Sequence, residues 1–261
     1  MEKLKDLDGL VSQLVNESNK QVEKLQEILK DFLNNYYIEF GKFKIEPLLI
    51  EAYYSNKDKN FIDEAVHAAR NENGKIATHA RERQKDNFGK LYIHNFKNKN
   101  DGLDICLSKG TYYFSVLVKN AIINGKEFAT QSQVSKIICD ECQKCNEVPK
   151  CIYYNDSVLK SRTQPKKANV VFLPRKGLSK GFVDKKLAAF RLNENIDINS
   201  LAKEHKSQWK KYVELLFEIN DEEVAFQEAI SKYNKKLTKG DKYWQNAVKC
   251  WKESKIINET L

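Results

Sequence analysis

The chain has 261 residues, of which 41% are hydrophobic and 11% aromatic, with 10 Gly and 4 Pro. This composition is typical of a folded globular protein and excludes collagen-like and linker sequences. No apolar run approaches about 18 residues and the first ten residues are rich in charge, so we expect neither a membrane span nor a signal peptide. A cytoplasmic location follows as an expectation, and the six Cys residues are then expected to be reduced.

The net charge of +9 is concentrated in the middle of the chain. Residues 1–44 hold 7 Lys and Arg against 8 Asp and Glu, and residues 195–261 hold 12 against 11. Residues 45–194 hold 26 against 17 and therefore carry the whole excess. A localised basic excess points to a polyanionic partner such as nucleic acid. The alternative is a biased base composition of the genome, which also yields Lys-rich and Asn-rich proteins.

The spacing of apolar residues changes twice along the chain. Between residues 3 and 34 they recur every three or four positions, which predicts one or two amphipathic helices. From Phe40 onward, short β-branched and aromatic runs predict the strands of one mixed or antiparallel sheet, which residues 169–174 and 186–192 would close. Two helices are predicted between the strands, one spanning Phe61 to Ala69 and one capped by Ser132.

From Ile198 the spacing is helical to the end of the chain. The elements together predict a mixed α/β (α+β) fold, with a curved, largely antiparallel sheet, an N-terminal helix and an appended C-terminal helical hairpin. We divide the chain into an N-terminal helical segment, a mixed α/β domain with a Cys-rich insertion, and a C-terminal helical module. Their bounds are residues 1–34, 35–194 with the insertion at 139–151, and 195–261.

The most informative stretch for chemistry is LLIEAYY, which ends at Tyr54. A carboxylate in the middle of an apolar strand is costly to bury, so Glu51 is a candidate functional residue. Strand alternation places Glu51 and Tyr53 on the same face. The segments that follow add further polar and aromatic side chains, which are Asp63, Glu64, His67, Tyr92, His94 and Asp104. If they converge on one sheet face, they would stack a flat ligand and activate a water molecule beside it.

The order of these segments resembles the alkyladenine (3-methyladenine, methylpurine) DNA glycosylases over about residues 34–193. The matching segments, in order, are LLIEAYY, DEAVHA, FGKLYIHNF, GLDICLS, YYFSVLVKNA and PRKGLSKGFVDKKLAAFRL. The resemblance implies a monofunctional DNA N-glycosylase of base excision repair, which flips a damaged base out of double-stranded DNA and hydrolyses its glycosidic bond. It implies no cofactor for catalysis.

The resemblance also implies roles for single residues. Glu51 matches the carboxylate that activates the attacking water, and Tyr53, His67 and the position of His94 match the walls that stack the base. Three positions differ from the family, because His94 replaces a Tyr, Asp104 replaces an Asn and Lys119 replaces an Arg. At the position of the family's intercalating aromatic residue this chain has Lys97, with Phe96 beside it. These differences leave the identity of the excised base open.

Two alternatives to the enzyme stay open from the residues alone. One is a metal-sensing or regulatory protein organised by the Cys residues at 139–151, and the other starts from the ordinary structural roles of the candidate site residues. Glu51 can be an edge carboxylate paired with a surface Lys, and His67 and His94 can be ordinary side chains. The chain would then be a non-catalytic nucleic-acid-binding relative that keeps the scaffold and the basic face. The enzyme requires Glu51 to point into a cleft wide enough for one base, with Tyr53 or His67 within about 4 Å of it. A pair between Glu51 and a surface Lys would favour the binding module.

A cluster of four Cys residues follows the helix predicted from Ser132. Cys139, Cys142, Cys145 and Cys151 have spacings of two, two and five residues between them, which suits structural Zn²⁺ or an iron–sulfur cluster. The alternative is four ordinary thiols. Cys106 and Cys250 lie on strand and helix patterns and are expected to be core residues.

Overall fold

The structure is a computed structural model, in which the chain forms one compact unit from residue 1 to Arg191. The segments of this unit that the structure describes are residues 2–66, 88–94, 102–109, 111–125, 127–144, 159–166, 170–173, 175, 182 and 185–191. The C-terminal helices predicted after residue 195 lie outside them.

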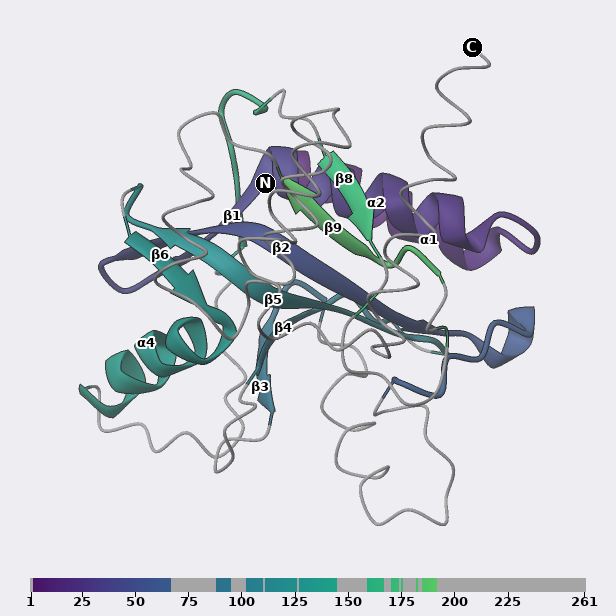
Figure 1. Cartoon of the computed structure of the whole chain (residues 1–261). Helices are drawn as coiled ribbons and strands as arrows, with labels where there is room; N and C mark the ends of the chain where they lie inside the picture. The colour runs from purple at the N-terminus through teal and green to yellow at the C-terminus, as the bar shows by residue number, and fades with distance from the viewer. Residues whose placement is uncertain are drawn as a thin grey trace, which may run out of the picture. The chain divides into compact units, whose positions relative to one another are not determined.

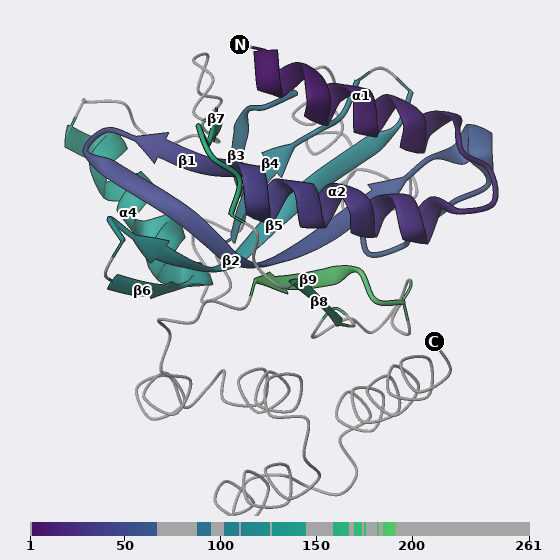
Figure 2. The same ribbon diagram turned by 90° about the horizontal axis from the view of Figure 1, so that it is seen from above.

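Two helices begin the chain, α1 (Glu2–Asn16) and α2 (Gln21–Asn35). The apolar spacing continues in both, but the chain turns between them, where the Glu17 carboxylate accepts hydrogen bonds from the backbone N–H groups of Ser18 and Asn19. The two helices lie side by side against the sheet (Figure 2). The N-terminal helical segment therefore belongs to the same unit as the sheet and shares its core.

Nine strands in the described part of the chain form one curled antiparallel sheet, which confirms the predicted curved, largely antiparallel sheet and resembles a half-barrel (Figure 1). Their order is β3-β4-β5-β2-β1-β7, while β6 pairs with β5, β9 with β2, and β8 with β9. The strands are β1 (Tyr36–Phe40), β2 (Phe43–Ser55), β3 (Leu91–His94), β4 (Gly102–Cys106), β5 (Tyr113–Ile123), β6 (Glu127–Thr130), β7 (Leu159–Ser161), β8 (Val170–Leu173) and β9 (Ala188–Arg191). The late strands expected at residues 169–174 and 186–192 are confirmed as β8 and β9.

Two helix predictions were wrong in detail. Residues 60–66 are not helical, because Phe61 forms an isolated β-bridge with Asn56 after the short 3₁₀ helix η1 (Lys57–Lys59). The helix α4 (Gln131–Lys144) begins one residue before Ser132, so Ser132 lies in its first turn. The cap is Thr130, whose backbone N–H donates to the side chain of Gln133 at 2.8 Å in half of a capping box.

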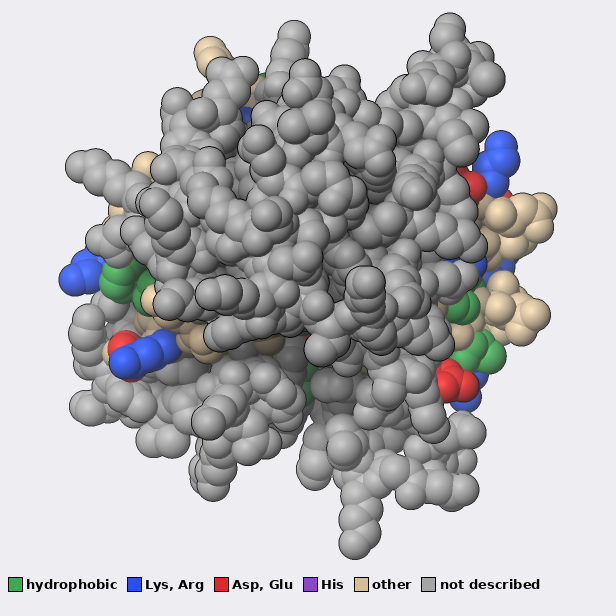
Figure 3. All heavy atoms as spheres, viewed as in Figure 1, with side chains coloured by type: hydrophobic (Ala, Val, Ile, Leu, Met, Phe, Trp, Pro, Cys, Tyr) green, Lys and Arg blue, Asp and Glu red, His purple; other side chains and the backbone are tan. Residues whose placement is uncertain are grey.

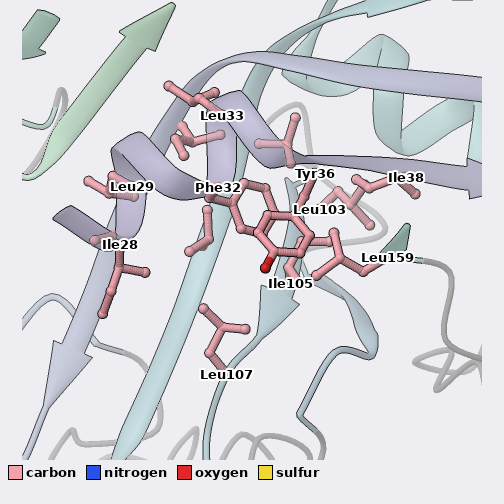
Figure 4. Packing of buried hydrophobic residues seen from close by; sticks show 14 of the residues in the cluster. Ile28, Leu29, Phe32, Leu33, Tyr36, Ile38, Leu103, Ile105, Leu107 and Leu159 are labelled. Atoms are coloured by element: carbon pink, nitrogen blue, oxygen red, sulfur yellow. The ribbon is translucent and has the colours of Figure 1, made fainter. Parts of the chain in front are cut away.

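One apolar core joins the first two helices to the sheet. Phe32 of α2 and Tyr36 at the start of β1 pack with their ring centroids 5.9 Å apart. Figure 4 shows these rings among aliphatic side chains of β4 and β7, including Leu103, Ile105 and Leu159. The buried side chains of β2 that join this core include Ile50 and Ala52, so strand alternation turns Glu51 to the opposite face of the sheet.

No helix in the described part of the chain is long and apolar enough to cross a membrane.

Candidate functional site

A row of side chains crosses the face of the sheet opposite α1 and α2. Glu51 on β2 is paired with Leu117 on β5 and with Ala188 on β9. Leu117 is also paired with Asp104 on β4, and Asp104 with Tyr92 on β3. Residues that face one another in adjacent strands point to the same side of a sheet. The row therefore runs from Tyr92 through Asp104 and Leu117 to Glu51 and Ala188, and the structure brings together three residues that the sequence selected.

The carboxylate of Glu51 is fully buried, with 0% of its side chain exposed. The hydroxyl of Tyr53 donates a hydrogen bond to its Oε2 atom at 2.9 Å. The ammonium of Lys119, a side chain that is 21% exposed, lies 3.8 Å from the same oxygen. The predicted common face of Glu51 and Tyr53 is thus confirmed. Glu51 contacts both Tyr53 and Lys119, so these contacts alone do not decide between an enzyme and a binding module.

Tyr53 is held as a hydrogen-bond donor by its surroundings. Burial raises the pKa of the Tyr53 hydroxyl well above its ordinary value, and the nearby charge of Glu51 raises this pKa further. The guanidinium of Arg175 acts in the opposite direction, since it lies 4.7 Å from the centroid of the Tyr53 ring. Because the pKa remains high, the phenol keeps its proton at neutral pH and its O–H points to Glu51.

A buried ion pair supports Tyr53 from the other side. Arg175 Nη1 lies 2.6 Å from Asp63 Oδ2, and both side chains are 0% exposed. The same Nη1 donates to the backbone carbonyl of Ala52 at 2.9 Å, and Asp63 Oδ1 accepts from the backbone N–H of Ala65 at 3.0 Å. These contacts tie the segment after η1 and the segment after β8 to the centre of β2.

Asp104 lies on the same face but further along the row. It is 4% exposed, and the hydroxyl of Ser115 donates to its Oδ1 atom at 3.1 Å. Since β5 separates β4 from β2, Asp104 and Glu51 are two strand spacings apart, or about 10 Å. The two carboxylates therefore occupy separate positions on the face.

Other predicted site residues are placed only in part. His94 is the last residue of β3, where it is paired with Gly102. His67 and Phe96 lie outside the described residues. The stacking roles of these three side chains stay predictions.

The Cys cluster lies partly on α4. This helix contains Cys139 and Cys142, whereas Cys145 and Cys151 fall outside the described residues. Among the residues that the structure does describe, no three His, Cys, Asp or Glu side chains form a metal-binding group. The Zn²⁺ or iron–sulfur site stays a prediction. Cys106 is a buried core residue, as expected, and burial raises the pKa of its thiol.

Sequence reasoning missed the pairing of Asp63 with Arg175. Both charged residues follow apolar runs, FI before Asp63 and VVFLP before Arg175, and this context is the signal that could have selected them.

In comparisons with known proteins, neither a scan against protein-family models nor a search of curated proteins finds a match to this chain.

Proposed function

We propose that the protein is a DNA N-glycosylase-like hydrolase that releases a modified base from DNA, with Glu51 as its catalytic base. The observation that carries the proposal is the buried Glu51 carboxylate, which accepts a hydrogen bond from Tyr53. Burying a carboxylate is costly, and such groups concentrate at sites where they act on a substrate. The resemblance of residues 34–193 to the alkyladenine DNA glycosylases gives the reaction class.

The reaction needs one proton acceptor and one nucleophile. Glu51 takes a proton from water, and the water oxygen forms a bond to C1′ as the bond from C1′ to the base nitrogen breaks. The base leaves with that electron pair and is protonated by solvent, while the sugar keeps the hydroxyl. Tyr53 holds the carboxylate in one orientation, and Lys119 contributes positive charge 3.8 Å from it.

The test is base release from duplexes that each carry one damaged base. Glu51→Gln keeps the side-chain shape but removes the proton acceptor, so release should fall by about 10²-fold or more while duplex binding is kept. Tyr53→Phe removes only the hydrogen bond to Glu51 and should cost about tenfold. Glu39→Gln is the matched control, because Glu39 is an exposed carboxylate on β1 and its loss should leave release unchanged. Equal activity of Glu51→Gln and wild type would remove Glu51 from the mechanism.

The second candidate function is nucleic-acid binding without turnover, which the contact between Lys119 and Glu51 favours. In that case Glu51 neutralises a basic side chain of the binding surface. Glu51→Gln would then release Lys119 for phosphate contacts and tighten binding, with no base released by either protein. In the enzyme, the same substitution abolishes release without tightening binding, so one variant separates the two functions.

Charge on the surface bears on both candidates. On the face shown in Figure 3, described Lys and Arg side chains lie beside Asp and Glu side chains and do not gather in one patch of a single sign. The contact surface for nucleic acid is to be located by mutation.

A further inference from the structure

A second buried charge cluster surrounds Glu46 on β2. Its Oε1 atom lies 3.1 Å from Lys44 Nζ and 3.1 Å from Arg162 Nη1. Its Oε2 atom lies 2.6 Å from Lys166 Nζ and 3.6 Å from Arg191 Nη2. One carboxylate thus has four cationic neighbours. We call these five residues the Glu46 cluster.

The cluster sits where the sheet divides. One edge of β2 pairs with β1 up to Ile45 and then with β9 from Leu49 to Glu51, which leaves Glu46 at the gap between the two partner strands. The last turn of α2 ends beside this gap, where Arg191 Nη1 donates to the carbonyl of Leu33 at 3.2 Å. The backbone N–H groups of Arg162 and Lys166 donate to the carbonyls of Asn35 and Asn34. These bonds satisfy helix-end carbonyls and fix the positions of the cations.

The cluster carries more positive charge than its carboxylate balances. Lys44, Lys166 and Arg191 bring three positive charges to one negative charge, and Arg162 adds a fourth. Burial lowers the pKa of Arg191 to about 10, and the charge of Arg162 contributes to that lowering. Burial also lowers the pKa of Lys166, with Arg191 and Arg162 lowering it further against the opposing effect of Glu46. The cations thus repel one another and would gain from a further anion.

The geometry leaves donors for such an anion. Arg191 is 1% exposed; its Nε atom has no hydrogen-bond acceptor among the described residues, and its Nη2 atom lies 3.6 Å from Glu46 Oε2 in an ion pair that is longer than a hydrogen bond. Lys44 and Lys166 have side chains that are 49% and 40% exposed, so they form the solvent side of the cluster while the two guanidiniums form its floor.

We propose that the Glu46 cluster binds a phosphate monoester, with Lys44 and Lys166 at its entrance and Arg191 at its floor. The four cations leave an excess of three positive charges over Glu46, and a phosphate monoester, with about two negative charges at neutral pH, balances most of this excess. A phosphodiester carries one negative charge and would leave most of the excess unbalanced. Planar guanidinium groups suit the oxygens of phosphate in geometry as well as in charge. The group is the terminal phosphate of a nucleic-acid strand, of a nucleotide, or free phosphate.

The first test uses the full chain and inorganic phosphate. Thermal unfolding is measured by circular dichroism over a range of phosphate concentrations, against chloride at equal ionic strength. Phosphate also stabilises proteins in general by being excluded from their surface, so the specific effect is the difference between wild type and variant. Lys166→Gln should lose a saturable rise in Tm that wild type shows, and Lys166→Arg should retain it. Lys44→Gln, at the more exposed lysine, serves as a second variant if Lys166→Gln does not fold.

The second test identifies the source of the phosphate. An oligonucleotide with a 5′-phosphate and the same strand with a 5′-hydroxyl are compared for binding to wild type and to Lys166→Gln. About tenfold tighter binding of the phosphorylated strand, lost in the variant, assigns the site to a strand end. A Tm response to phosphate without this preference assigns it to a small phosphorylated molecule or free phosphate. Equal Tm responses of wild type and Lys166→Gln, together with no preference between the strands, would overturn the proposal. Glu27→Gln, which changes an exposed carboxylate of α2 outside both clusters, should behave as wild type in both tests. Neither test measures base release, which keeps the outcome separate from the glycosylase proposal.

Discussion

The ion pair between Asp63 and Arg175 is expected to be the most sensitive polar contact of the candidate site. Both side chains are 0% exposed and their charged atoms are 2.6 Å apart. Arg175→Met leaves the Asp63 carboxylate buried without its cation, and breaking a buried pair in this way costs about 3–5 kcal/mol of unfolding free energy. Asp63→Asn leaves the buried Arg175 guanidinium without a carboxylate and should cost a similar amount. The amide oxygen of the new Asn side chain can still accept the hydrogen bond from the backbone N–H of Ala65. The double variant contains no buried unpaired charge, so we expect it to lose only about 1–2 kcal/mol.

Urea unfolding measures this double-mutant cycle. Circular dichroism is the suitable signal, because α1, α2 and α4 report on the unit that contains the pair, whereas the three Trp residues all follow residue 191. The expected coupling energy is at least about 2 kcal/mol with an unchanged m-value. Lys24→Met is the control, since the pair between Lys24 and Glu27 is exposed and worth about 0.5 kcal/mol or less. A coupling energy below about 0.5 kcal/mol for Asp63 and Arg175 would refute the reasoning.

Three further predictions follow from the same structure. Burial alone would raise the pKa of Glu46, but hydrogen bonds from Lys166 and Arg162 lower it from 4.5 to about 2. The ionised Glu46 therefore stabilises the fold above about pH 5, and this contribution to the unfolding free energy is lost as the pH falls through 2. With the half-exposed lysines screened by water, unfolding free energy at pH 3 should be about 1–2 kcal/mol below that at pH 7, and Glu46→Gln should show a smaller pH slope in urea titrations. Phe32→Ala removes a fully buried ring of the main core and should cost about 3–5 kcal/mol, measured as a lower urea midpoint. If the Cys cluster binds Zn²⁺, elemental analysis should find one metal ion per chain in wild type and less in Cys142→Ser. The control Cys106→Ser should retain the metal. The absence of metal from anaerobically purified wild type would contradict the site.

Local patterns were sufficient to predict much of the sheet and one contact of the site. Alternation along LLIEAYY placed Glu51 and Tyr53 on one face, and the structure joins them by a hydrogen bond. The same rule needs no knowledge of the other strands, because it depends only on the pleat of β2. The two N-terminal helices and the late strands could also be predicted, because their patterns of apolar residues are local to each segment.

Contacts between distant segments could not be predicted in this way. Asp63 and Arg175 are 112 positions apart, and they meet only because the segment after β8 returns to the centre of β2. The cap of α4 was misplaced because Thr130 and Ser132 are both suitable capping residues, and the backbone geometry decided for Thr130. Likewise, nothing in the spacing of Arg162 and Arg191 indicates that both reach Glu46.

An irregularity in β2 relates the two charge clusters to each other. Strict alternation would put Glu46 and Glu51 on opposite faces, since five positions separate them. However, the pairing register with β5 shifts between Pro47 and Ile50, and both Ile45 and Ile50 join the helical core, so both carboxylates lie on the other face. The two residues are about 16 Å apart along the strand, which exceeds the Debye length of about 8 Å at physiological salt.

This separation makes the two proposals independent in experiment. Sites more than about 7–10 Å apart that share no partner usually contribute additively. Glu51→Gln and Lys166→Gln should therefore have additive effects on strand binding, within about 0.5 kcal/mol. The affinities of the two single variants and the double variant for the 5′-phosphorylated strand measure this directly. A larger coupling would mean that one ligand bridges the two clusters or that β2 shifts as a unit, and either result would contradict the assignment of separate sites.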